Sequence, residues 1–267
     1  DGGLDDLLIA YPLVGEAKLR RLGDLLERAR VRVSLDSVEV AEGLGRPPGP
    51  PTAELVGKVA RVPGVEVVGL LTHAGHAYRA ATPEALRHAA EREGLDLVET
   101  AALCRRDGIT LEEISVGSTP TARAGAFIDG VTEIRPGTYA LNDATMMRLG
   151  VATEATAAAR VLATVVARPD GDRFVLDAGS KCVTTDNMGA VPDWLVVAGR
   201  PDLHMDFLSE EHGVGHRGGA GDVRIGERLR VIPSHACTTM NLFDVAYGVR
   251  GGRVERELGI AGRGRVR

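Results

Sequence analysis

No run in this sequence approaches 18 consecutive apolar residues, so we expect no membrane-spanning helix. Basic runs are missing apart from the short tail Arg263–Arg267, and the formal net charge is −5. Because nucleic acids and anionic membrane surfaces recruit clustered Lys and Arg, neither is an expected partner. Cysteines are few, widely spaced and odd in number (Cys104, Cys182 and Cys237). This usage argues against a disulfide framework and favours reduced thiols in a cytoplasmic protein.

Aromatic residues make up only 3% of the chain, which gives the position of each tyrosine more weight than usual. Tyr78 and Tyr139 each lie just beyond an expected strand end, where (β/α)8 barrels build their active sites. The length and the overall composition are ordinary: the chain has 267 residues, of which 44% are hydrophobic and 26% are charged. They predict a globular chain with room for two domains.

Strands and helices alternate through the first 150 residues. Buried apolar runs predict strands at 7–13, 31–36, 65–71, 113–116 and 131–134. Helical spacing or caps predict helices at 16–29, 52–62, 83–94, a further stretch up to Cys104, and 121–127, with another helix start at Asp36–Ser37. Such alternation is typical of a parallel α/β domain. Five strands are too few for a closed eight-stranded barrel, so residues 1–150 form either a smaller α/β fold or an incomplete (β/α)8 barrel.

The pattern changes after Gly150. Residues 161–166 and 174–177 flank the turn Pro169–Asp172 and predict a hairpin. Short strands are expected at 223–225, 229–232 and 244–249, with no convincing helix among them. The sequence therefore predicts a C-terminal all-β domain over 151–267.

Two glycines, Gly117 and Gly137, each follow an apolar strand and open a loop rich in small polar residues. Free backbone N–H groups there, with the hydroxyls of Ser118, Thr119 and Thr138, suit a phosphate dianion. Barrel enzymes often hold phosphate in the loops after their last two strands. Two ordinary strand-to-loop turns would look the same, because short glycine motifs occur by chance.

His235-Ala-Cys237 is the sharpest local feature. It follows an expected strand, and alternation would place the imidazole and the thiolate on one face. The pair suits a borderline divalent metal, zinc first, and leaves positions open for water and substrate. A packed histidine beside a buried thiol is the alternative. His73 and His76 are either ligands or loop histidines satisfied by the backbone, and Glu210–His212 is better explained as a charged surface turn.

Six stretches together resemble one known family: Leu71–Tyr78, Val116–Thr121, Glu133–Tyr139, Asp177–Lys181, Ser209–Gly213 and Pro233–Cys237. The resemblance is to the D-serine dehydratase/D-threonine aldolase family, of the alanine racemase-like fold type of pyridoxal-phosphate enzymes. It implies that 1–150 is an incomplete (β/α)8 barrel that binds pyridoxal phosphate, followed by a β domain that carries a metal pair, and it implies a head-to-tail homodimer. Carried over by motif, the cofactor phosphate would contact Gly117, Ser118, Thr119, Gly137, Thr138 and Tyr139. Tyr78 would line the pyridine ring as the one candidate catalytic residue, and His235 and Cys237 would bind zinc.

The chain departs from the family in its lysines. The resemblance implies a Schiff-base lysine in a Pro-His-x-Lys-Thr-His-like motif near the N-terminus, and this sequence has only Lys18, Lys58 and Lys181, each in a different context. Its opening segment resembles a mid-barrel strand, so we expect the first strands to be missing.

The family implies a lyase for a small D-amino acid with a 3-hydroxyl. Pyridoxal phosphate would delocalise the electrons left at Cα. Zinc would act as a Lewis acid on the hydroxyl. D-Serine dehydratase-like β-elimination to a 2-oxo acid and ammonia is favoured by His-x-Cys over His-x-Asp. Aldol cleavage to glycine and an aldehyde is the first alternative. A non-catalytic pyridoxal-phosphate carrier is the second, favoured by the missing lysine.

Overall fold

This computed structural model describes residues 3–35, 49–186 and 193–265, and the chain divides into two compact units. The barrel unit consists of Asp1–His73, Ala90–Gly117 and Ala124–Arg135, and the β unit of Ala74–Ala89, Ser118–Arg123 and Pro136–Arg267. A domain boundary near residue 150 stays a prediction. The helix start expected at Asp36–Ser37 lies outside the described residues.

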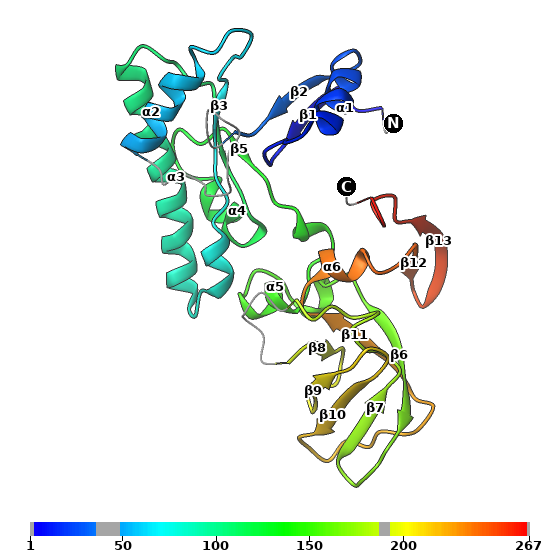
Figure 1. The fold of residues 1–267 in the computed structure, drawn as a ribbon. Helices are drawn as coiled ribbons and strands as arrows, with labels where there is room; N and C mark the ends of the chain where they lie inside the picture. The colour runs from blue at the N-terminus through cyan, green and yellow to red at the C-terminus, as the bar shows by residue number, and fades with distance from the viewer. Residues whose placement is uncertain (1–2, 36–48, 187–192, 266–267) are drawn as a thin grey trace. The chain divides into compact units, whose positions relative to one another are not determined.

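The described residues of the barrel unit form five parallel strands in two sheets; Figure 1 shows their arrangement. The first sheet pairs β1 (Asp6–Ile9) with β2 (Arg30–Val33), and the second has the order β3-β4-β5. The strands of the second sheet are β3 (Gly69–Leu71), β4 (Glu113–Val116) and β5 (Glu133–Ile134). The incomplete parallel barrel expected from the sequence is confirmed.

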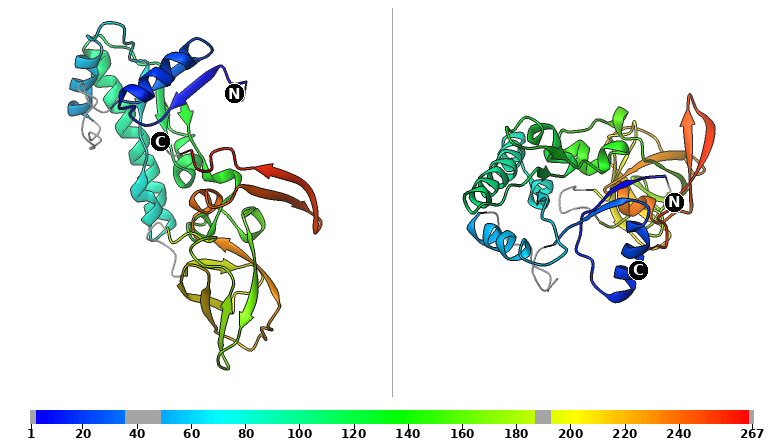
Figure 2. Two further views of the ribbon diagram at one scale, coloured as in Figure 1. Left: turned by 45° about the vertical axis from the view of Figure 1, so that its right-hand side comes forward. Right: turned by 90° about the horizontal axis from the view of Figure 1, so that it is seen from above.

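Two helices cover the second sheet, α2 (Pro50–Val59) and α3 (Pro83–Arg106) (Figure 2). Ala53 and Val56 of α2 pack in the same buried cluster as Ile114 and Val116. Leu97, Ala101 and Cys104 of α3 belong to this cluster too. The separate helices expected at 83–94 and up to Cys104 are one continuous helix. Gly94 does not end it, because a Cβ there would lie 2.5 Å from Ile128, so a glycine is needed for packing. The other α-helices among the described residues up to position 150 are α1 (Glu16–Leu26), α4 (Thr119–Gly125) and α5 (Ala144–Arg148).

The β unit is built on a six-stranded antiparallel sheet with the order β8-β11-β6-β7-β10-β9. Its strands are β6 (Val161–Ala167), β7 (Arg173–Leu176), β8 (Leu195–Val197), β9 (Leu203–Leu208), β10 (Gly213–Arg217) and β11 (Arg228–Pro233). Alternate residues point inward, and Phe174, Leu176 and Val231 are fully buried at its centre. The expected β6–β7 hairpin is confirmed.

Two details of the expected β domain are wrong. Val223–Ile225 is not a strand but part of the turn before β11. The C-terminal part also contains a helix, α6 (Ala236–Met240), which begins directly after β11. Short 3-10 turns complete the β unit: η1 (Gly75–Arg79), η2 (Thr138–Ala140) and η3 (Glu154–Thr156).

A separate hairpin, β12 (Val245–Arg250) and β13 (Arg253–Gly259), extends away from the six-stranded sheet (Figures 1 and 2). Every residue of β13 is exposed. Tyr247 and Val249 of β12 are also more than half exposed. Most of the hairpin surface is therefore exposed, and only Val245, Ala246 and Gly248 are half-buried. No helix in the described part of the chain is long and apolar enough to cross a membrane.

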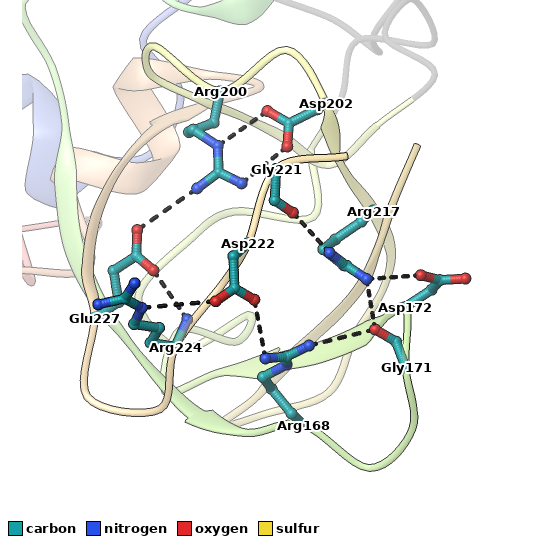
Figure 3. Close-up of polar contacts among 10 residues, drawn as sticks. All are labelled: Arg168, Gly171, Asp172, Arg200, Asp202, Arg217, Gly221, Asp222, Arg224 and Glu227. Atoms are coloured by element: carbon teal, nitrogen blue, oxygen red, sulfur yellow. Dashed lines mark hydrogen bonds and ion pairs between the residues drawn. The ribbon is translucent and has the colours of Figure 1, made fainter. Parts of the chain in front are cut away.

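Ion pairs tie together the loops at one end of the six-stranded sheet (Figure 3). Arg200 contacts both oxygens of Asp202 at 2.9 and 2.8 Å. This contact holds the pKa of Asp202 below its usual value. The other members of this network are Arg168, Arg217, Arg224, Asp172, Asp222 and Glu227.

Candidate metal and cofactor site

The His-x-Cys pair lies where β11 runs into α6. His235 has extended backbone at the start of the helix, and Cys237 lies in its first turn. The sequence predicted that strand alternation would place the two side chains on one face. This reason is wrong, because Cys237 lies in a helix and not in a strand. The helical turn nevertheless lets them interact, and the Cys237 hydrogen bond raises the pKa of His235 to about 9. The same contact lowers the pKa of the Cys237 thiol. The site therefore stabilises the thiolate, the form of cysteine that binds a metal.

Asp186 holds the His235 ring from the other side. Its Oδ2 lies 2.7 Å from Nδ1 of His235. Metal-bound histidines commonly donate one ring N–H to a carboxylate, which fixes the tautomer and leaves the other nitrogen for the ion. The sequence did not single out Asp186, because it lies far from His235 along the chain. Among the described residues, no group of three or more His, Cys, Asp or Glu is arranged as a metal site, so protein ligands beyond the pair are not defined.

Asp143 supports the backbone between the two candidate ligands. It is only 1% exposed, and its Oδ1 accepts the Met146 N–H at 2.9 Å as the N-cap of α5. Its Oδ2 accepts the N–H of Ala236 at 3.0 Å. Burial raises the pKa of Asp143, although the two backbone donors favour its charged form. This residue was also missed, although an Asp before a helix is a recognisable cap signal.

Tyr78 and Thr138 lie beside the same pair. Thr138 Oγ1 is 3.7 Å from the Cys237 sulfur. Tyr78 is buried, and burial, followed by the charges of Cys237 and Asp143, raises its pKa. Tyr78 and Thr138 come from two separate sequence motifs, and both lie near Cys237 in the β unit.

A cavity of about 610 Å³ opens at Cys237. Besides the thiol, Asn241 and Leu242, its lining includes four hydroxyl side chains: Ser180, Thr184, Thr185 and Thr238. These groups can donate and accept hydrogen bonds. The cavity therefore offers hydrogen-bond partners to a small molecule bound beside Cys237.

The candidate phosphate residues are only partly brought together. Ser118, Thr119, Gly137, Thr138 and Tyr139 belong to the β unit. The Ser118 hydroxyl lies 2.9 Å from that of Thr121. Thr119 Oγ1 is buried and has no hydrogen-bond partner among the described residues. A buried hydroxyl rarely stays unpaired, so a ligand oxygen fits here. Tyr139 is 63% exposed.

Gly137 fits a bound phosphate as well. Its φ of −98° is open to any residue, and a Cβ there would meet no protein atom within 4 Å. Neither the backbone nor protein packing therefore requires glycine. Close approach of a ligand to the main chain would require it.

Gly117 has a different environment. It belongs to the barrel unit, and its N–H donates to Glu93 at 3.2 Å. A Cβ would lie 2.9 Å from Arg135, so packing against this side chain already accounts for the glycine. Arg135 in turn donates to Ser115 and to the Thr72 carbonyl at the ends of neighbouring strands. Gly117 also lines a cavity of about 1010 Å³ in the barrel unit.

The three lysines all make surface contacts. Lys18 lies over the Tyr11 ring, and Lys58 pairs with Glu54 one helical turn away. Lys181 pairs with Glu210 at 2.9 Å and Glu211 at 2.7 Å. The Glu210–His212 segment is thus a charged surface turn, as the sequence favoured. His73 and His76 are exposed, in the barrel unit and the β unit respectively.

Comparison with known proteins identifies the relatives of this chain. Residues 15–145 match the family model "Alanine racemase, N-terminal domain", and residues 158–249 match "Putative serine dehydratase domain". D-threo-3-hydroxyaspartate dehydratase of Delftia sp. (strain HT23) is 35% identical over 80% of this chain and 60% of its own length. D-threonine aldolase of Arthrobacter sp. is 32% identical over 98% of this chain and 75% of its own length. The chain thus spans between three fifths and three quarters of these two relatives.

Solved structures agree with these matches. D-threonine aldolase from Filomicrobium marinum superposes with a TM-score of 0.83 at 26% identity, over 98% of this chain and 78% of that one. D-threo-3-hydroxyaspartate dehydratase from Delftia sp. HT23 gives 0.73 at 30% identity, over 96% and 72%. Two further structures of that dehydratase have alanine in place of a histidine and of a cysteine two positions apart, and the cysteine mutant is in the metal-free form. The chain belongs to the alanine racemase-like family that includes D-threonine aldolase, D-threo-3-hydroxyaspartate dehydratase and D-serine dehydratase.

Proposed function

We propose that this protein is a pyridoxal-phosphate- and zinc-dependent lyase acting on a small D-3-hydroxy amino acid. The main support for this proposal is the His235–Cys237 pair. The pKa of the Cys237 thiol is lowered, and Asp186 contacts the His235 imidazole. The hydroxyl-lined cavity beside Cys237 supports a small polar substrate. The proposal places the reaction in the same part of the β unit as Tyr78 and Thr138.

The two bound groups would supply an electron sink for the bond broken at Cα and a Lewis acid for the 3-hydroxyl. The chain's own residues would position them. Thr119, with Ser118, Gly137 and Thr138, would hold the phosphate, and Tyr78 would pack beside the ring. His235 and Cys237 would hold the zinc ion, and Asp186 would keep the imidazole oriented. The assignments of Gly117 and Tyr139 to the phosphate belong to this proposal as predictions from motif only.

Elimination of the hydroxyl, as in D-serine dehydratase, is the reaction we favour. The supporting observation is that a dehydratase relative also has a histidine and a cysteine two positions apart, with a metal-free cysteine mutant. Aldol cleavage is the second candidate, favoured by the structural similarity to the Filomicrobium aldolase. The absence of a lysine from the described site residues instead favours a non-catalytic carrier of pyridoxal phosphate.

Cys237→Ala tests the proposal, with Cys182→Ala as the matched control because that thiol is partly buried in the apolar core. Zinc content, pyridoxal-phosphate binding and turnover of D-serine and D-threonine should be measured on the complete gene product. We expect Cys237→Ala to lose most of its zinc and its turnover but to keep pyridoxal phosphate, and Cys182→Ala to keep all three. The products separate the two reactions: 2-oxo acid with ammonia for elimination, glycine with an aldehyde for cleavage. Full zinc and turnover in Cys237→Ala would overturn the proposal.

A homodimer and a cytoplasmic location complete the proposal. The exposed hairpin β12–β13 and the exposed Tyr139 are consistent with surfaces covered by a second chain. Analytical ultracentrifugation of the active protein tests the assembly. An active monomer at assay concentration would refute it.

A further inference from the structure

Asp186 contacts the His235 imidazole although its own side chain is 42% exposed. Holding a partly exposed side chain in one direction costs rotamer entropy, and a fixed backbone lowers that cost. We propose that Thr184 and Ser234 are positioning residues for this carboxylate. Through Asp186 they keep the His235 ring in one orientation. This role belongs to the zinc site of the proposed function and rests on that function.

Two hydroxyl groups hold the backbone of Asp186. Thr184 Oγ1 accepts the Asp186 N–H at 2.9 Å. Serine and threonine hydroxyls form such turns with an N–H two positions on. The hydroxyl of Ser234, which is fully buried, donates to the Asp186 carbonyl at 2.9 Å. Both backbone polar groups of Asp186 are therefore hydrogen-bonded, which restricts the turn that carries its carboxylate.

Thr184 is itself anchored to the helix that carries the second candidate ligand. It is only 6% exposed. Its Oγ1 also accepts the Thr238 hydroxyl at 2.8 Å, and its N–H donates to Thr239 Oγ1 at 3.3 Å. Both partners belong to α6, whose first turn contains Cys237. One buried side chain thus connects the turn of Asp186 with the helix of Cys237.

These contacts depend on the hydroxyl group of Thr184. A hydroxyl oxygen has two acceptor lone pairs, and here they receive the Asp186 N–H and the Thr238 O–H. Valine has nearly the same shape but no acceptor, so the Asp186 N–H would lose this partner. Because a backbone N–H that loses its partner turns to water or another acceptor, the turn at Asp186 should shift.

The size of the effect follows from the place of Thr184 in this chain of contacts. Loss of the carboxylate that supports a metal-bound histidine typically lowers metal affinity about 10- to 100-fold. Thr184 acts through that carboxylate, so its loss should have a smaller effect. We expect Thr184→Val to weaken zinc binding roughly three- to tenfold, the factor that corresponds to the net contribution of one hydrogen bond.

The test measures two quantities on the complete gene product. Competition with a chromophoric chelator gives the zinc affinity, and the nitrogen-15 signal of His235 Nδ1 in the metal-free protein reports the contact with Asp186. Thr184→Val should weaken zinc binding and move this signal towards its position in Asp186→Ala. Thr184→Ser keeps the hydroxyl and should restore both values. Ser234→Ala is the second variant in case Thr184→Val folds poorly, and it should move the signal in the same direction.

Thr100→Val is the matched control. Thr100 is fully buried in the barrel unit, and its hydroxyl donates to the Asp96 carbonyl at 2.6 Å. Its replacement should lower the melting temperature but leave the zinc affinity and the His235 signal unchanged. A double mutant separates positioning from general stability. Because Thr184 acts through Asp186, Thr184→Val should cause no further loss of zinc affinity in an Asp186→Ala background.

The outcomes also separate this role from the proposed function. A His235 signal that stays at the parent's position in Thr184→Val or Ser234→Ala would overturn the proposal. An equal loss of zinc affinity from Thr184→Val with and without the Asp186 carboxylate would overturn it as well. If the parent protein binds no zinc, the proposed function fails, and the His235 signal alone then decides whether Thr184 positions Asp186.

Discussion

Replacing Asp143 with Asn separates two functions of one carboxylate. Oδ1 caps α5 through Met146, and Oδ2 holds the Ala236 N–H between the candidate metal ligands. Asn and Asp are about equally good N-caps, so the cap should survive. At the second position an amide NH₂ group would face the Ala236 N–H, donor against donor. A hydrogen bond to a charged acceptor contributes about 1.5–3 kcal/mol. Removing the buried charge, whose pKa burial raises, offsets part of that loss.

We therefore expect Asp143→Asn to lower stability by roughly 1–2 kcal/mol, the difference between these two effects. Zinc affinity should fall about tenfold, because the segment that carries His235 and Cys237 is no longer held by Asp143. A loss of about 1.4 kcal/mol in binding free energy corresponds to that factor. Thermal unfolding of the metal-free protein gives the first quantity, and competition with a chromophoric chelator gives the second.

Thr145→Val is the matched control. It removes the Thr145 hydroxyl bond to the Ser234 carbonyl at 2.7 Å, another link between α5 and the His-x-Cys segment that does not involve the N–H of Ala236. It should lower stability but leave zinc affinity unchanged. The reasoning fails if Asp143→Asn binds zinc as tightly as the parent, or if both variants weaken binding equally.

Four further predictions follow from single contacts. Gly137→Ala should leave the melting temperature unchanged, because no protein atom lies near its Cβ, but should weaken pyridoxal-phosphate binding measured by absorbance; equal binding would remove Gly137 from the site. Phe174→Ala, at a fully buried core position, should cost about 3–5 kcal/mol in denaturant unfolding, and a loss below 1 kcal/mol would contradict the described core. Asp202→Asn should destabilise the protein at neutral pH only: the pKa of Asp202 is lowered in the folded state, so its contribution is present above about pH 4 and disappears as the pH falls further, and an acid-unfolding series should show the two proteins converging. Borohydride reduction with pyridoxal phosphate bound should leave Lys181 unlabelled, because it is ion-paired with Glu210 and Glu211, and label there by peptide mapping would move the active site.

The sequence predicted the architecture well because hydrophobic periodicity follows burial. The parallel strands around Ile114 and Val116 and the hairpin around Phe174 are continuous or alternating apolar runs, and both were confirmed. The family resemblance was confirmed for a similar reason, since its motifs are local. Gly94 misled the helix assignment because its packing partner Ile128 is remote in sequence.

The candidate site was harder to predict because its supports are tertiary contacts. Asp186 lies 49 positions from His235, and Asp143 lies 93 positions from Ala236. No local pattern reveals such partners in one sequence. Even the His-x-Cys geometry came from an unexpected turn of helix. The residues were identifiable, but the reason that they meet was not.

The hairpin β12–β13 has consequences for how the molecule opens. An isolated two-stranded ribbon is marginally stable in water, and here every residue of β13 is exposed. Its amide protons should therefore exchange with solvent long before those of the six-stranded sheet. Trypsin should cleave after Arg250 or Arg253 at the hairpin turn while the six-stranded sheet is still folded. The candidate zinc ligands precede the hairpin in the chain, so the cleaved protein should still bind the ion. The hairpin can therefore unfold without loss of the metal.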